Sequence, residues 1–225
     1  MGASYHQFCP VAKAMELLDE RWTLLVMREL ILGTDRFNEL RRGVPRMSPS
    51  LLSQRLQRLV RAGVIERVED DEGVRYLPTQ AGLELRPVIE AVGAWGVRWV
   101  PELGDEDLDP HLLLWDMHRN VDFDEAPKSR TVVAFHFDDA SPRDWWIVID
   151  GDTTDLCDID PGFPVSATVR GSLRALIEVH RGDTGWREAL KSQTLSVEAP
   201  ERIRRQVPRW FRPSIFAEVP RLAPT

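Results

Sequence analysis

Apolar residues recur every three or four positions in four short segments of the first 62 residues, which is the spacing of amphipathic helices. Pro10 suits the first turn of one such helix, Gly33 suits the end of another, and Ser48-Pro49 is typical of a capped helix start. We therefore expect four helices, over residues 9–18, 22–32, 36–42 and 48–62.

Two β-branched segments follow at residues 64–68 and 74–77, joined by the acidic turn 69–73, and predict a hairpin. Pro78 should end its second strand, because proline cannot donate a ladder hydrogen bond. Thr79 is expected to cap a long fifth helix that runs to about residue 103. Short helices followed by a hairpin are the order of a winged helix, in which helix 48–62 would fit a DNA major groove.

A polar segment bounded by glycine and proline, residues 104–110, predicts a linker between two domains, 1–104 and 111–225. Beyond the linker we expect a helix, a meander of strands, two helices, a strand and a final helix. Their ranges are 111–120; 130–137, 144–150, 154–159 and 165–170; 172–180 and 186–192; 194–197; and 200–211. The predicted class is α+β, an N-terminal winged helix-turn-helix domain followed by a mixed α/β domain.

Helix 48–62 carries its leucines on one face and polar residues on the other. Serine, glutamine and arginine side chains can hydrogen-bond base edges and phosphates. Arginines before this helix suit phosphate contacts, and we favour the base of the wing over its acidic tip, which would repel phosphate. The predicted DNA-binding residues are Arg36, Arg46, Ser48, Pro49, Ser50, Ser53, Gln54, Arg55, Gln57, Arg58, Arg67 and Arg75. The alternative is an ordinary solvated helix face.

Net charge is −7, which at first argues against a DNA partner. The charge is unevenly distributed, because residues 21–67 hold ten arginines and four acidic residues, a net of +6. Residues 1–104 are neutral overall, so the remainder carries the whole negative charge. A local basic region can attract phosphates whatever the total charge. The two halves therefore look like different modules.

The remaining composition narrows the class of protein. No secretion signal and no apolar run of membrane-spanning length is present, and the two cysteines, Cys9 and Cys157, lie far apart. We expect a cytoplasmic protein with reduced thiols and no membrane insertion. Aspartates between 150 and 160 do not match a calcium-loop spacing, and no nucleophile or nucleotide-binding motif occurs. We expect no enzyme activity, no cofactor and no metal.

Several motifs in the first 100 residues resemble the HxlR-type regulators: Cys9-Pro-Val11, Arg21-Trp-Thr-Leu-Leu25, Arg36-Phe-Asn-Glu-Leu40, Gly63-Val-Ile-Glu-Arg67 and Trp95-Gly96. The resemblance implies a transcription regulator that binds a roughly palindromic operator as a homodimer. It implies a dimer contact through the first and last helices of the module, with Met15, Leu18, Val92, Trp95 and Trp99 as candidates. The alternative is packing of these side chains within one subunit. The acidic wing tip and residues 18–20 depart from the family pattern.

Cys9 is a candidate redox sensor, because in several HxlR-type relatives the matching cysteine has that role. A cysteine at a helix N-terminus can have a lowered pKa and more thiolate. The alternative is a small apolar residue with no chemical role. The first interpretation makes this protein a thiol switch that needs no further ligand.

Residues 130–220 resemble sterol-carrier-protein domains, which bind lipids on a mixed sheet with helices. The matching segments include Thr131-Val-Val-Ala-Phe135, Trp145-Trp-Ile-Val-Ile149 and Ala167-Thr-Val-Arg-Gly171. The resemblance implies a tunnel for a hydrophobic small-molecule effector, and pockets are lined mostly by apolar and aromatic side chains. The candidate lining residues are Trp115, Phe135, Phe137, Trp146 and Trp186. They could instead form an ordinary core, or the whole chain could be a lipid-binding module whose N-terminal domain mainly dimerises.

Overall fold

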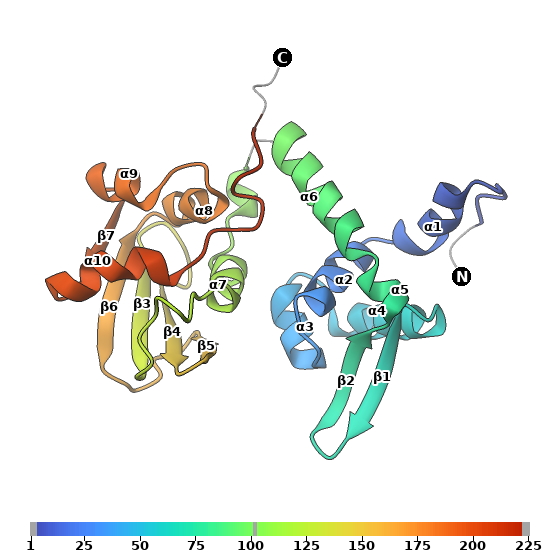
Figure 1. Cartoon of the computed structure of the whole chain (residues 1–225), viewed down its shortest axis with the longest axis horizontal. Coiled ribbons are helices and arrows are strands. Elements are labelled where there is room, and N and C mark those ends of the chain that lie inside the picture. The colour runs from blue at the N-terminus through green and yellow to red at the C-terminus, as the bar shows by residue number, and fades with distance from the viewer. Residues whose placement is uncertain (1–3, 101–102, 222–225) are drawn as a thin grey trace. The chain divides into compact units, whose positions relative to one another are not determined.

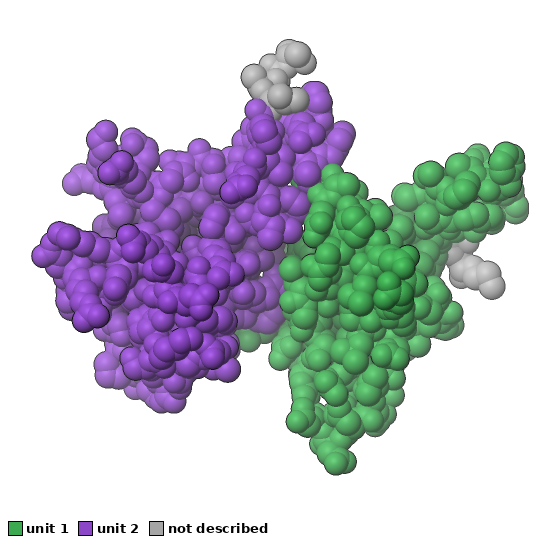
Figure 2. All heavy atoms as spheres, viewed as in Figure 1, with its two compact units in different colours: residues 1–93 green, residues 94–225 purple. Residues whose placement is uncertain are grey.

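The computed structural model describes residues 4–100 and 103–221. The described residues form two compact units, unit 1 up to residue 93 and unit 2 from residue 94 onward (Figure 2). The division falls inside one helix, α6, and each unit has its own hydrophobic core.

Unit 1 has the element order of a winged helix-turn-helix (Figure 1). The elements are α1 Pro10–Leu18, α2 Thr23–Ile31, α3 Phe37–Gly43, α4 Pro49–Arg61, β1 Ile65–Asp70, β2 Gly73–Pro78, α5 Gln80–Leu83 and α6 Arg86–Trp99. The two strands form an antiparallel hairpin in which Arg67 faces Tyr76. The hydrophobic core of unit 1 is formed by one face each of α2, α3 and α4, through side chains such as Met27, Leu40 and Leu56. The helices and the end of β2 at Pro78 agree with the sequence prediction.

The predicted long fifth helix is wrong, because the segment after Thr79 forms two helices. Thr79 does cap α5, where its side chain accepts a hydrogen bond from the Gly82 amide at 3.4 Å. The helix then stops at Leu83, and α6 begins at Arg86. Pro87 lacks the N–H that would bond to the Leu83 carbonyl in a continuous helix, which explains the break. Helix α6 ends at Trp99. Residues 101–102, which belong to the predicted range of the long helix, lie outside the described residues.

Unit 2 combines a five-stranded sheet with helices (Figure 1). Its elements are η1 Asp105–Asp107, α7 Pro110–Arg119, β3 Thr131–Phe137, β4 Asp144–Asp150, β5 Thr153–Cys157, β6 Val165–Gly171, α8 Leu173–Arg181, α9 Trp186–Lys191, β7 Leu195–Glu198 and α10 Glu201–Trp210. The strand order is β5-β4-β3-β6-β7. Central strand β3 is almost wholly buried, as expected of a strand with neighbours on both sides.

The predicted meander is correct for β3, β4 and β5 but wrong for β6. Strand β6 lies on the other side of β3 and pairs with it in parallel, with Val133 opposite Ala167. A parallel neighbour needs a long connection, and the chain supplies it by running through β4 and β5 first. The sheet is therefore mixed, and β7 closes it by antiparallel pairing with β6.

Candidate nucleic-acid interface

A buried carboxylate lies at the contact between α2 and α3. Glu29 is fully buried, and Arg28 of the same helix donates to its Oε1 from Nε at 3.0 Å and from Nη2 at 2.8 Å. Arg28 Nη2 also donates to the Gly43 carbonyl at 3.3 Å, at the end of α3. Gly43 lies so close that a Cβ there would stand 2.0 Å from Glu29 Oε2. The backbone of α3 therefore rests directly on this ion pair, which sets the position from which α4 begins.

Helix α4 anchors one face in the core and leaves the other to solvent. Leu52, Leu56 and Leu59 have 0% exposure. The Ser48 hydroxyl accepts a hydrogen bond from the Leu51 amide at 3.3 Å, which satisfies one free donor at the helix start. The solvent-facing side holds Pro49, Ser50, Gln54, Gln57 and Arg61, with Ser53 partly exposed. This face can reach a groove, and its side chains offer both donors and acceptors.

Arg55 does not lie on the outward face of α4, because its side chain is buried on the anchored side. The residue is only 7% exposed and donates to the Arg21 carbonyl at 3.1 Å. Glu20, in the turn before α2, forms ion pairs with both Arg55 and Arg58. Arg58 also donates to the Glu16 carbonyl at 2.5 Å and keeps 17% side-chain exposure. Both arginines therefore tie α4 to α1 and the following turn, and neither points freely outward.

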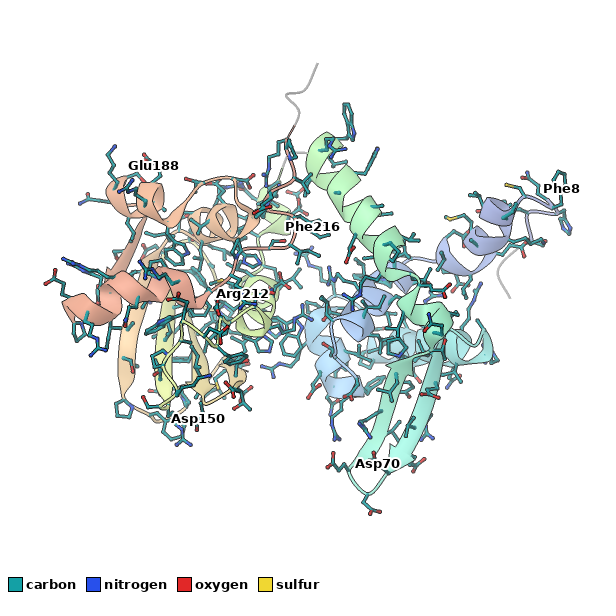
Figure 3. All side chains as sticks on the ribbon, viewed as in Figure 1. Phe8, Asp70, Asp150, Glu188, Arg212 and Phe216 are labelled. Carbon is teal, nitrogen blue, oxygen red and sulfur yellow. The ribbon has the colours of Figure 1, made fainter. Side chains whose placement is uncertain are left out.

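The wing arginines all have acidic partners. Arg67 pairs with Glu69 at 2.9 Å, and Arg75 pairs with Asp70. The hydrogen bond from Arg75 lowers the pKa of the Asp70 carboxyl, at the tip labelled in Figure 3. Arg36 of the turn before α3 reaches across to the wing, where it donates to the Glu72 carbonyl at 2.7 Å. These exposed pairs are weak, so phosphates could compete for the arginines, but the wing itself is acidic.

Arg61 is an exposed arginine of the outward face that the predicted site left out. It lies four residues after Gln57, and helical spacing alone already assigns it to the polar face of α4. Arg46 lies in the exposed turn before α4, as the sequence predicted, and Arg41 is exposed on α3. Together these arginines border the polar face of α4.

Apolar side chains are exposed on α1 and α6, the helices that extend from the core of unit 1 in Figure 1. Neither helix has a buried residue. The exposed fractions are 36% for Met15, 53% for Val92, 59% for Trp95 and 54% for Trp99, whereas Leu18 is partly buried. Among the described residues, these side chains thus keep a large part of their surface exposed, except Leu18. Cys9 precedes α1 as its N-cap residue, is partly exposed and forms no disulfide.

The structure separates the five candidate pocket residues, with three in the core of unit 2 and one at a pocket. Trp115, Phe135 and Phe137 are at most 4% exposed and belong to the core of unit 2, and Trp146 is partly exposed on β4. Trp186 does line a pocket, of about 230 Å³. The other lining residues come from α7, α8, the loop between α8 and α9, and the chain from Pro208 onward: Met117, Leu176, Val179, His180, Gly182, Thr184, Gly185, Pro208, Phe211, Arg212, Pro213 and Ala217.

A histidine and a carboxylate form a close pair beside this pocket. His180 Nε2 lies 2.8 Å from Asp116 Oδ2, and Arg119 pairs with the same carboxylate at 3.0 Å. Burial would raise the pKa of Asp116, but the hydrogen bonds and charges of His180 and Arg119 outweigh it and lower the pKa to about 2.

Among the described residues no three histidine, cysteine or acidic side chains form a metal-binding group, and no helix is long and apolar enough to cross a membrane.

Comparisons with known proteins concern the N-terminal part of the chain. The family HxlR-like helix-turn-helix matches residues 17–103. The HTH-type transcriptional regulator Mb3122 of Mycobacterium bovis is 42% identical over 96 residues, which are 40% of this chain and 59% of that protein. The chain thus spans about three fifths of the length of that relative. The reduced form of the regulator YodB from B. subtilis is similar over 43% of this chain and 100% of that one, with 30% identity and a TM-score of 0.38.

A second relative is matched over most of its length. The HTH-type transcriptional regulator YvaP of Bacillus subtilis is 32% identical over 98 residues, which are 42% of this chain and 91% of YvaP. With the winged arrangement of unit 1 and the match over residues 17–103, this similarity shows that the chain belongs to the HxlR-like helix-turn-helix family.

Proposed function

We propose that this protein is a DNA-binding transcription regulator that inserts α4 into the major groove of its operator. One observation carries the proposal: α4 is fixed by buried leucines on one face and presents Ser50, Gln54, Gln57 and Arg61 to solvent on the other. Glutamine can make paired hydrogen bonds to adenine, and arginine to guanine. Arg41 and Arg46 would contact phosphates beside the groove.

The proposed regulator is a homodimer that uses α1 and α6. Exposed apolar patches on a soluble domain are typical of interfaces, and Trp95 and Trp99 lie four residues apart on one side of α6. Two copies joined in this way would present two α4 helices to a roughly palindromic site. Trp95→Ser with Trp99→Ser should yield monomers by analytical ultracentrifugation, and a variant that remains dimeric would exclude this face.

In the proposed division of labour, residues 1–104 bind DNA and dimerise, and residues 111–225 receive an apolar effector. The pocket beside Trp186 supports the second role, because its lining is mostly apolar with a few polar groups such as Thr184. An engineered cavity of roughly 150 Å³ holds benzene, so about 230 Å³ suits a substituted single ring. Toluene and benzoate are suitable probes. A rise in melting temperature that Thr184→Trp abolishes would support the effector, and no rise in the unaltered protein would reject it.

DNA binding is tested with a site selected from random duplexes. Arg61→Gln should weaken binding by roughly tenfold and relax the preference at one base position, since a paired arginine contact contributes about 1–3 kcal/mol. Arg143→Gln is the matched control, an exposed arginine of unit 2 that should leave affinity unchanged. If no site is enriched and binding to mixed duplexes does not fall with salt, the proposed function is excluded.

A further inference from the structure

Cationic side chains gather on the last two helices of unit 2, although this half of the protein is acidic. We call them the α9–α10 basic cluster: Arg187, Lys191, Arg202, Arg204, Arg205 and Arg209. Residues 186–212 hold seven basic and three acidic residues, a net of +4. The rest of 105–225 holds eight basic and nineteen acidic residues, a net of −11. The positive charge of this half is therefore concentrated in one segment.

The cluster is exposed and nearly free of acidic partners. All six side chains are exposed, and within the described part of the chain only Arg205 forms an ion pair, with Glu201 one turn earlier. Helices α9 and α10 both pack against β7, the edge strand of the sheet (Figure 1). Arg187 and Lys191 thus belong to the same region of unit 2 as α10. Figure 3 labels Glu188 on α9 and Arg212, which follows α10.

Within α10 the arginines follow helical spacing. Arg202, Arg205 and Arg209 are three and then four residues apart, so they line one side of the helix. At 1.5 Å per residue they span about 10 Å. Like charges at this spacing destabilise a helix by a few tenths of a kcal/mol per pair. The arrangement costs stability in the free protein, and a polyanion laid along the row would relieve it.

The other side of α10 is used by the core. Val207 and Trp210 have 0% exposure, so the apolar face that a membrane-surface helix would insert into lipid is already buried in protein. Neither α9 nor α10 has an exposed large apolar side chain. The exposed surface of these helices therefore offers a partner positive charge but no apolar face. This favours binding to the phosphates of a nucleic acid over binding to a lipid surface.

We propose that the α9–α10 basic cluster binds the sugar–phosphate backbone of duplex DNA outside the base pairs contacted by α4. The inference rests on the proposed DNA-binding function, which brings DNA to this chain. Guanidinium groups bind phosphate oxygens through paired, charge-assisted hydrogen bonds. Such contacts carry no sequence information, but they add affinity and make it depend on salt.

The experiment compares three full-length proteins that differ in charge by matched amounts. The test variant is Arg202→Gln, Arg205→Gln and Arg209→Gln. The control is Lys128→Gln, Arg130→Gln and Arg143→Gln, which removes the same charge from exposed positions elsewhere in unit 2. Each protein is titrated at several salt concentrations against a 20-bp duplex with the selected site and against a 50-bp duplex with the same site in its centre.

Each phosphate contact contributes about 0.9 to the magnitude of the slope of log K against log salt. On the 50-bp duplex, this magnitude should be smaller in the test variant by roughly 3 if the cluster of one protomer binds DNA. It should be smaller by roughly 5 if the clusters of both protomers bind. The control should have the same slope as the unaltered protein. On the 20-bp duplex, all three proteins should have equal slopes. Equal slopes on the 50-bp duplex overturn the inference, and an equal loss on both duplexes overturns the flanking position.

Two further outcomes distinguish failure of the proposed function from failure of this inference. If the unaltered protein binds neither duplex, the proposed function fails and the inference fails with it. Vesicles with one third phosphatidylserine provide the last arm. If the unaltered protein and the control bind these vesicles, the test variant does not, and the DNA slopes are unchanged, then the cluster binds lipid and the proposal is overturned.

Discussion

The pairing of Glu20 with Arg55 allows a sharp test of whether Arg55 is structural or binds DNA. Glu20→Gln removes the carboxylate that faces both Arg55 and Arg58. The amide oxygen of the new glutamine can still accept a hydrogen bond, but the negative charge that faces the Arg55 guanidinium is lost, and this side chain is 8% exposed. Removing one partner of a buried pair costs about 3–5 kcal/mol.

Because the Glu20 side chain is 30% exposed, solvent screens part of the loss and we expect about 2–3 kcal/mol. For a unit of fewer than one hundred residues this is a fall of roughly 10–20 °C in melting temperature. Arg55→Met in the Glu20→Gln background should recover part of the stability, because it removes the unpaired buried charge. Thermal unfolding followed by circular dichroism measures all the variants in one double-mutant cycle.

DNA titrations on the same variants complete the test. Arg55→Met, measured below its melting temperature, should keep the salt slope of the unaltered protein, since a side chain buried against Glu20 cannot reach a phosphate. A slope smaller by about 1, with stability unchanged, would identify Arg55 as a phosphate contact and refute the structural interpretation.

Three further predictions follow from described contacts. Gly43→Ala should cost about 1–3 kcal/mol in urea unfolding, because its Cβ would collide with buried Glu29, whereas Gly96→Ala, which meets no atom within 4 Å, should be neutral or stabilising. The lowered pKa of Asp116 stabilises unit 2 above pH 3.8, and roughly 1–2 kcal/mol should be lost as pH falls toward 2; Asp116→Asn should remove this dependence. Cys9→Ser should leave the affinity of the reduced protein unchanged, and an oxidant response that persists in this variant eliminates the thiol hypothesis.

Local patterns in the sequence predict most elements of this fold. Each helix of unit 1 up to α4 was found from apolar spacing and end residues such as Pro10 and Ser48, because these signals act within one turn. The break between α5 and α6 was also visible in principle. Pro87 is a helix breaker, but the capping residue Thr79 and the apolar pattern beyond it favoured one continuous helix.

Features that depend on distant residues were not predictable. The parallel pairing of β3 with β6 depends on contacts across more than thirty residues, which alternation within a strand does not reveal. Helical spacing places Arg55 three residues after Leu52 and four before Leu59, on the buried side of α4. Its partner Glu20 lies 35 residues earlier in the chain, and local spacing does not reveal that pairing. Three of the five aromatic pocket candidates, Trp115, Phe135 and Phe137, belong to the core, because composition cannot distinguish a lining side chain from a packed one.

Helix α1 has nine residues and none of them is buried. Isolated helices shorter than about 12–15 residues are only marginally stable in water. If a second copy covers α1, as proposed, then subunit association and the ordering of this helix are one thermodynamic event. Helix content should then rise with protein concentration, and the amides of 10–18 should exchange with solvent at a rate that reports the fraction of free monomer. Cellular abundance would thus regulate how much of the chain is folded.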